Sequence, residues 1–139
     1  MSGKGPDLVI GIDLGGTNMR GALFRGLGAA AAKAATDPLG PQEMKALHPV
    51  AERREKVGSE RAPDTMVERM AAVVDSLLEE GGVRGERVPV GIGLAGMLRG
   101  QSGIVAQSPH LGWKNVSLGD MMRTRLGPGH PLVVENDGN

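Results

Sequence analysis

The chain has no cysteine and very few aromatic side chains, with one Phe, one Trp and no Tyr among its 139 residues. The absence of cysteine excludes disulfides and thiolate-ligated metal sites within these residues. A core with so few rings must be built from aliphatic side chains and from the eight methionines. The length suits one domain with a modest core.

Excess charge of one sign is also missing, because the 16 Lys and Arg residues balance the 16 Asp and Glu residues. A groove for nucleic acid usually carries a basic excess, so we expect no nucleic-acid partner. The first residues are too polar for a signal peptide, and the apolar runs are far shorter than a membrane span. We therefore expect a cytoplasmic protein with no membrane partner.

Glycine, in contrast, is abundant, with 23 residues, many of them beside apolar runs. Apolar runs bounded by turn residues predict strands, and apolar positions at helical spacing predict helices. The expected strands are residues 7–13, 19–24, 48–57 (a charged edge strand), 88–95, 104–106 and 131–135, and the expected helices are residues 63–80 and 117–126. Residues 25–41, which include an alanine-rich run, are interpreted as a low-complexity connection.

The helix expected at residues 63–80 has the strongest signal. Its apolar face comprises Val67, Met70, Ala71, Val74, Leu77 and Leu78. Thr65 and Glu68 have the spacing of a capping box, and Gly81 and Gly82 are expected to end the helix. Methionine fills irregular gaps in a core, so we interpret the methionines of this helix as packing residues and not as ligands.

A first glycine pattern, G-x-G-x-x-G, occupies residues 91–96. A dinucleotide site needs this pattern to open a helix whose N-terminus holds the pyrophosphate. The residues after Gly96 have turn composition instead, and Gly91 and Gly93 alternate with apolar residues inside the expected strand. We favour a buried strand against which a neighbour packs closely, and keep a dinucleotide-binding module as an alternative. A strand, and not a helix, directly after Gly96 would exclude the dinucleotide-binding module.

A second pattern, Asp13-Leu14-Gly15-Gly16-Thr17-Asn18, follows the first apolar run. Gly15 and Gly16 can adopt positive φ and carry no Cβ to block a phosphate, while backbone N–H groups of such a turn can bind an anion. Thr17 and Asn18 can add donors, and Asp13 can face a Mg²⁺ ion held between it and the phosphates. A plain hairpin whose turn is capped by Asp13 explains the same residues equally well, so both interpretations stay open.

The last residues, Glu135-Asn136-Asp137-Gly138-Asn139, also allow two interpretations. Asp-Gly and Asn are ordinary turn residues, and from the residues alone a turn is favoured over a catalytic base at Asp137. The histidines at positions 48, 110 and 130 have no spacing that indicates a metal site. Trp113 fits either a core position or a lid over a cleft.

Four stretches together resemble the ROK family of sugar kinases (repressor, open reading frame, kinase). They are I-G-I-D-L-G-G-T-N-M-R at 10–20, G-I-G-L-A-G at 91–96, S-P-H-L-G-W-K-N-V at 108–116 and V-V-E-N-D-G-N at 133–139. The first alone marks the wider actin-like ATPase group, and its combination with L-G-W-K-N-V and E-N-D is strongly specific. The resemblance spans almost the whole chain except about 25–60, a connection that looks longer than is usual in the family.

The resemblance implies an α/β fold, a ribonuclease-H-like (actin-like ATPase) lobe with a mixed five-stranded sheet and helices. Residues 1–139 would be the N-terminal lobe of a two-lobed kinase, with the second lobe, its adenine site and its zinc site absent. The implied roles are ATP phosphate and Mg²⁺ binding for Asp13, Gly15, Gly16, Thr17 and Asn18, sugar binding for Gly96, His110 and Asn136, and general-base catalysis for Asp137. No other metal is expected within the chain.

The function implied is ATP-dependent phosphorylation of a hexose to a sugar 6-phosphate, as in a glucokinase, with a homodimer as the full-length form. The chain alone is expected to turn over little or nothing. A non-catalytic, sugar-responsive regulator of the same family is the alternative, and Asp137 favours the kinase because a sensor needs no base. Ala95 and His110 replace a Pro and an Asn that are common in the family, and the second change bears on which sugar is preferred.

Overall fold

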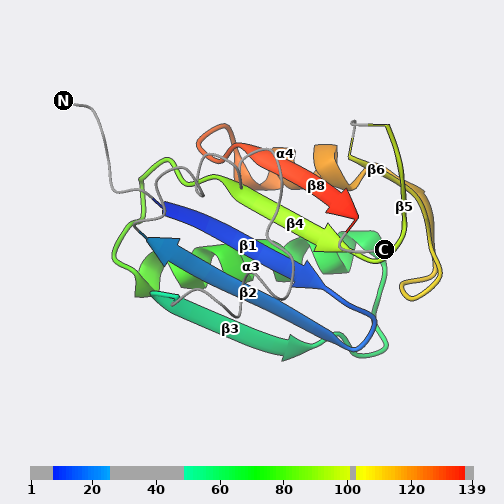
Figure 1. Ribbon diagram of the computed structural model, residues 1–139, viewed down its shortest axis with the longest axis horizontal. Helices are drawn as coiled ribbons and strands as arrows, with labels where there is room; N and C mark the ends of the chain where they lie inside the picture. The colour runs from blue at the N-terminus through cyan, green and yellow to red at the C-terminus, as the bar shows by residue number, and fades with distance from the viewer. Residues whose placement is uncertain (1–7, 26–48, 101–102, 137–139) are drawn as a thin grey trace.

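The computed structural model describes residues 8–25, 49–100 and 103–136. A five-stranded mixed sheet lies over two helices, and a small three-stranded antiparallel sheet adjoins one end (Figure 1). In chain order the elements are β1 (Leu8–Leu14), β2 (Asn18–Arg25), β3 (Ala51–Lys56), α3 (Pro63–Glu80), β4 (Val90–Leu94), β5 (Met97–Arg99), β6 (Ile104–Ser108), β7 (Trp113–Val116), α4 (Leu118–Leu126) and β8 (Leu132–Asn136).

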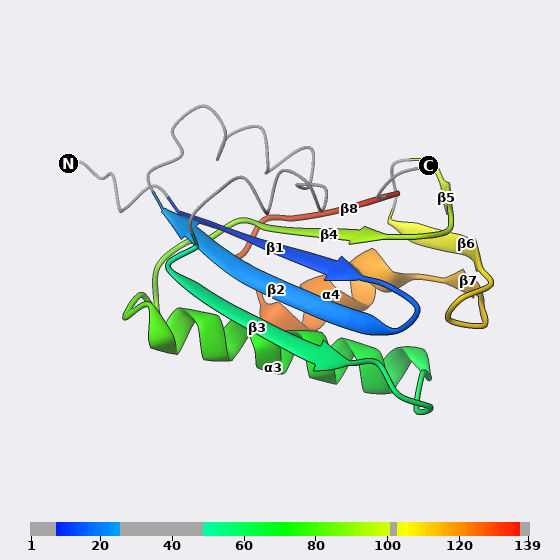
Figure 2. The same cartoon turned by 60° about the horizontal axis from the view of Figure 1, so that its bottom comes forward.

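The large sheet has the strand order β3-β2-β1-β4-β8. Strands β1, β2 and β3 form antiparallel pairs, whereas β4 pairs in parallel with both β1 and β8. Both helices pack on the same face of this sheet, as Figure 2 shows from the side. The carboxyl ends of the three parallel strands therefore meet at one edge, where the candidate site lies.

Helix α3 spans the predicted residues, Pro63–Glu80, and buries the predicted apolar face. Its buried residues are Met66, Val67, Met70, Ala71, Val73, Val74, Leu77 and Leu78. The predicted capping box is wrong, because Ala62 is the N-cap and makes no side-chain capping bond. The helix begins at Pro63, whose fixed φ suits the first turn. Thr65 therefore lies within the first turn and cannot be the N-cap that a capping box requires.

The core between sheet and helices is aliphatic, as the composition predicts. Ile10, Ile12 and Ile92 are at most 1% exposed and face α3 and α4 together with buried methionines. Gly21 of β2 lets α3 approach closely, because a Cβ there would lie 2.6 Å from Cγ1 of Val73. Within the described part of the chain, no helix is long and apolar enough to cross a membrane.

The small sheet, β5-β6-β7, was predicted only in part. Residues 97–99 were expected in a turn, yet they form β5, and no strand was expected at Trp113, which begins β7. These strands have three and four residues, too few for an alternating pattern to emerge. The strand directly after Gly96 also excludes the dinucleotide-binding alternative, since no helix begins there to hold a pyrophosphate.

Candidate functional site

The predicted site residues that the structure describes gather at the edge where the parallel strands end. Asp13 of β1 is in register with Gly93 of β4, and Gly93 with Glu135 of β8. Asn136 is the next residue of β8, so it shares this edge with Asp13. Ligands of open α/β sheets bind beyond the carboxyl ends of the strands. The predicted base, Asp137, follows Asn136 in the sequence and lies outside the described residues.

The loop between β1 and β2 is a tight turn. The Gly15 N–H donates to the Asn18 carbonyl over 2.9 Å, and the Thr17 carbonyl accepts from the Val57 N–H over 2.8 Å. Gly15 and Gly16 do not adopt the positive φ that the sequence allowed. Their value is space, because a Cβ on Gly15 would lie 3.2 Å from the Asn18 carbonyl oxygen. Thr17 and Asn18 are exposed at the tip.

His110 lies directly against this loop. A Cβ added to Gly16 would be 3.2 Å from Cβ and 3.3 Å from Nδ1 of His110. The predicted phosphate loop and one predicted sugar-binding residue are thus neighbours, although they are 94 positions apart (110 − 16). The His110 carbonyl accepts a 2.6 Å hydrogen bond from Nη1 of Arg61. Sequence analysis missed Arg61, which belongs to no motif and precedes α3 in a connecting segment.

The other two predicted sugar-binding residues are also brought together. The side-chain amide of Asn136 donates to the Gly96 carbonyl. Gly96 has no room for a side chain, because a Cβ would lie 2.7 Å from the Gln107 carbonyl oxygen and 3.1 Å from Cβ of Ser108. Ser108 is fully buried and donates from Oγ to the Ala95 carbonyl over 2.9 Å. This network fixes the turn between β4 and β5 against β6 and β8.

Trp113 occupies a core position and is not a lid. Its side chain is 3% exposed, and Nε1 donates to the Arg61 carbonyl over 2.7 Å. A buried indole N–H usually finds an acceptor, and here that acceptor is backbone. The tryptophan therefore anchors the turn that carries His110 to the segment before α3.

The donor set suits one Mg²⁺ ion held mainly by phosphate. Among the described residues, no three or more His, Cys, Asp or Glu side chains cluster as metal ligands. Mg²⁺ in nucleotide sites is usually bound through one or two carboxylates, with phosphate oxygens and water as the other ligands. Asp13 at the end of β1, followed by a turn without Cβ atoms at Gly15 and Gly16, fits that arrangement.

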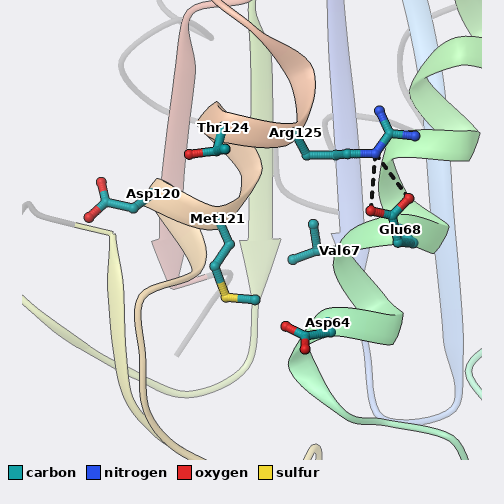
Figure 3. A pocket seen from close by; sticks show the side chains of 7 residues that line it. All are labelled: Asp64, Val67, Glu68, Asp120, Met121, Thr124 and Arg125. Atoms are coloured by element: carbon teal, nitrogen blue, oxygen red, sulfur yellow. Dashed lines mark hydrogen bonds and ion pairs between the residues drawn. The ribbon is translucent and has the colours of Figure 1, made fainter.

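A hollow of about 560 Å³ lies between α3 and α4, and none of the predicted site residues lines it (Figure 3). It is lined by Asp64, Val67, Glu68, Asp120, Met121, Thr124 and Arg125. Nε of Arg125 lies 2.9 and 3.1 Å from the two carboxylate oxygens of Glu68. This hydrogen bond and the charge of Glu68 raise the pKa of Arg125. The two charged side chains that border the hollow on this side are thus paired with each other.

A family model described as the ROK family matches residues 9–139. The chain belongs to the ROK family. This ROK chain is 31% identical over 132 residues to glucokinases of Streptomyces coelicolor and Streptomyces lividans. The match covers 95% of the chain and 33% of each relative, so the chain spans about a third of the length of these curated relatives.

Solved structures agree with the family. The ROK family glucokinase from Streptomyces griseus in complex with glucose and AMPPNP is 26% identical, with a TM-score of 0.65 over 95% of this chain and 34% of that one. The inorganic polyphosphate/ATP-glucomannokinase from Arthrobacter sp. strain KM is 25% identical, with a TM-score of 0.65 over 96% and 45%. The predicted α/β lobe of the actin-like ATPase type, with its mixed five-stranded sheet, is confirmed.

A regulator shares the fold as well. The ROK family transcriptional regulator that is a homologue of E. coli MLC protein is 21% identical, with a TM-score of 0.64 over 94% of this chain and 28% of that one. Kinases and a regulator are thus built on the same lobe. The fold does not decide between these functions, which depend on the residues of the site.

Proposed function

We propose that this chain is the N-terminal lobe, residues 1–139, of an ATP-dependent hexose kinase of the glucokinase type, which forms a sugar 6-phosphate. The observation that carries the proposal is the placement of His110 against Gly16 at the sheet edge that Asp13, near the end of β1, shares with Asn136, the last residue of β8. A loop that binds the ATP phosphates and residues that bind the sugar, placed at one sheet edge, would bring the two substrates close enough for transfer of a phosphoryl group from ATP to the sugar.

The phosphate side of the proposed site is the turn from Asp13 to Asn18. Phosphoryl transfer depends mostly on positioning and on stabilising charge, and little covalent chemistry is required of the protein. Gly15 and Gly16 leave room for phosphate oxygens close to the backbone, and the exposed Thr17 and Asn18 can donate hydrogen bonds to them. Asp13 would hold Mg²⁺, which when bound neutralises phosphate charge.

The sugar side comprises Gly96, His110, Asn136 and Asp137. Asn136 already binds the Gly96 carbonyl, so its amide is oriented before a sugar arrives. Asp137 would accept the proton of the attacking hydroxyl, a role that requires an ionised carboxylate within hydrogen-bond reach. The neutral His110 ring has one hydrogen-bond donor and one acceptor. It could therefore favour sugars whose hydroxyl groups match this pattern.

The remaining parts of the proposal concern the whole protein. The curated relatives are about three times as long as the matched region, which covers 33% of them. We propose that a second lobe completes the adenine and sugar sites in the full-length protein, that any zinc belongs to that lobe, and that the enzyme is a cytoplasmic homodimer. The unusually long connection at 25–60 belongs to the same proposal, and residues 26–48 of it lie outside the described residues.

A sugar-responsive regulator is the second candidate, because a ROK family transcriptional regulator has the same fold and the fold is compatible with both functions. A coupled assay of ADP release separates the two. The full-length product that contains these residues should consume ATP with glucose, fructose, mannose or an N-acetyl hexosamine, and the rate should depend on Mg²⁺. Sugar binding without any ADP release across this set would favour the regulator and overturn the kinase.

A further inference from the structure

Arg61 makes three hydrogen bonds that join segments far apart in the sequence. Its Nε donates to the Gly58 carbonyl over 2.7 Å, and its Nη1 donates to the His110 carbonyl over 2.6 Å. Its own carbonyl accepts from Nε1 of Trp113 over 2.7 Å. One residue of the connection between β3 and α3 thus contacts the turn that carries His110 at two points, inside the turn at His110 and directly after it at Trp113.

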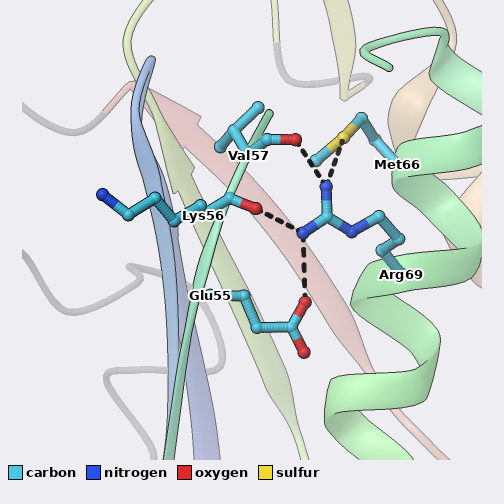
Figure 4. Close-up of polar contacts among 5 residues, drawn as sticks. All are labelled: Glu55, Lys56, Val57, Met66 and Arg69. Atoms are coloured by element: carbon cyan, nitrogen blue, oxygen red, sulfur yellow. Dashed lines mark hydrogen bonds and ion pairs between the residues drawn. The ribbon is translucent and has the colours of Figure 1, made fainter. Parts of the chain in front are cut away.

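The other end of the same connection holds the phosphate loop. The Val57 N–H donates to the Thr17 carbonyl over 2.8 Å. Val57 itself is fixed from α3, because Nη1 of Arg69 donates to its carbonyl over 2.6 Å and Nη2 donates to the Lys56 carbonyl over 2.5 Å (Figure 4). The segment from Val57 to Arg61 therefore rests on the helix at one end and touches both ligand loops.

The contacts form a closed path. It runs from the phosphate loop at Thr17 to Val57, along the chain to Arg61, across to His110, and back to the phosphate loop at Gly16. A loop held at two points moves less independently than a loop held at one. Displacement of the phosphate loop should consequently reach His110 by contact and by hydrogen bonds.

We propose that Arg61 is a positioning residue that fastens the His110 turn to the phosphate loop and thereby couples nucleotide binding to sugar binding. The coupling to sugar rests on the function proposed above, whereas the mechanical link between the loops does not. Arginine suits the role because its planar guanidinium presents several donors in a fixed fork. Lysine has a single nitrogen on a flexible stem, so it can reach one of the two carbonyls at a time.

Replacing the Arg61 side chain tests only its hydrogen bonds to Gly58 and His110, because Trp113 donates to the backbone carbonyl of Arg61 and this bond is retained. Arg61→Met removes both side-chain bonds at similar length, and Arg61→Lys keeps one donor. Arg84→Met is the matched control, because Arg84 is an exposed arginine whose carboxylate partner, Glu79, is 4.0 Å away. Circular dichroism and thermal melts would show which variants are folded. If Arg61→Met fails to fold, Arg61→Lys carries the comparison.

The first measurement is hydrogen exchange of the full-length protein with and without MgAMPPNP. We expect the analogue to protect residues 15–18 and also residues 108–113 in the wild type and in Arg84→Met. In Arg61→Met the protection at 15–18 should remain and that at 108–113 should be clearly lower than in the wild type, with the remainder transmitted by the direct contact between Gly16 and His110. Equal protection at 108–113 in Arg61→Met and wild type, or none there in the wild type, would overturn the link.

The second measurement is calorimetric titration of glucose with and without MgAMPPNP. The nucleotide should tighten glucose binding about 5-fold or more in the wild type, within the usual range of coupling between sites. The factor by which MgAMPPNP tightens glucose binding should fall toward 1 in Arg61→Met. In Arg61→Lys it should lie between the wild-type value and that of Arg61→Met. An unchanged factor in Arg61→Met overturns the coupling even if the enzyme is an active kinase. Arg61-dependent exchange without ADP release on any sugar would instead overturn the kinase and leave the link between loops standing.

Discussion

The side-chain amide of Asn136 donates a hydrogen bond to the backbone carbonyl of Gly96, which joins the end of β8 to the turn after β4. Two residues for which the resemblance to the ROK family implied sugar binding are therefore in contact. The bond holds the amide at the sheet edge that also carries Asp13, near the end of β1. Its removal should disturb sugar binding more than nucleotide binding.

We expect Asn136→Ala to raise the KM for the sugar about tenfold or more, equivalent to at least about 1.4 kcal/mol, and to leave the KM for ATP within about twofold. The free energy of unfolding should fall by about 0.5–1.5 kcal/mol, the usual net value of one hydrogen bond. Steady-state kinetics and urea titration measure both. Gln107→Ala, which removes an exposed amide from neighbouring β6, is the control and should change neither KM. Equal rises in both KM values would argue against a sugar role for Asn136.

Gly16→Ala tests the contact between the phosphate loop and His110. The new Cβ would lie 3.2 Å from Cβ of His110, so one of the two must move by a few tenths of an ångström. We expect weaker MgATP binding by about tenfold, or about 1.4 kcal/mol. Gly129→Ala is the control, because a Cβ there meets nothing within 4 Å.

The double variant Gly16→Ala, His110→Ala separates crowding from other effects. If the His110 ring causes the loss, its truncation should restore part of the MgATP affinity lost in Gly16→Ala, as a coupling energy in a double-mutant cycle. Calorimetric titration of MgAMPPNP into the four proteins measures it. Strict additivity would show that the imidazole ring of His110, which His110→Ala removes, does not cause the loss of MgATP affinity.

Asp137→Asn should lower kcat by about 10²–10⁴-fold, the range that a general base contributes, with little change in the KM for ATP. The measurement is the rate of ADP release at saturating sugar. Asp120→Asn on α4 is a matched control, since Asp120 is an exposed carboxylate 80% accessible to solvent. An Asp137→Asn enzyme with the kcat of the wild type would remove Asp137 from the base role.

Arg69→Met should destabilise the fold by about 1–3 kcal/mol, because it leaves carbonyls at the end of β3 without their charged donor. Arg69 donates to the Val57 and Lys56 carbonyls and lies 3.1 Å from a carboxylate oxygen of Glu55. Arg53→Met is the control, since its partner lies 3.6 Å away and both side chains are about half exposed (48% and 50%). Exposed pairs of this kind contribute little, about 0–1 kcal/mol. Urea unfolding of both variants decides the comparison.

The sequence predicted best those elements whose own residues determine them. Helix α3 was placed at the right residues because eighteen positions carry a periodic apolar face. The short strands β5 and β7 were missed because they depend on pairing with β6, which no local pattern encodes. Gly15 and Gly16 were singled out from the sequence, but they do not adopt the positive φ that the sequence allowed. A side chain on Gly15 would crowd the Asn18 carbonyl oxygen, and one on Gly16 would crowd His110.

Arg61 shows why the rest of the site was hidden. Its partners, Gly58, His110 and Trp113, are separated from it by 3, 49 and 52 positions. Its side chain donates to the backbone carbonyls of Gly58 and His110. Every residue has a backbone carbonyl, so no sequence motif can indicate such a contact. Such a contact becomes visible only when the chain is folded, because the fold brings the connection before α3 beside the turn after β6.

Strand β3 forms one border of the large sheet, and its consecutive residues Glu52, Arg53, Arg54, Glu55 and Lys56 are all exposed. A strand from another molecule that paired with β3 would have to lie beside a row of positively and negatively charged side chains. Charged borders of this kind oppose edge-to-edge aggregation. The charges of β3 therefore oppose fibril-like stacking of neighbouring molecules at this margin of the described sheet.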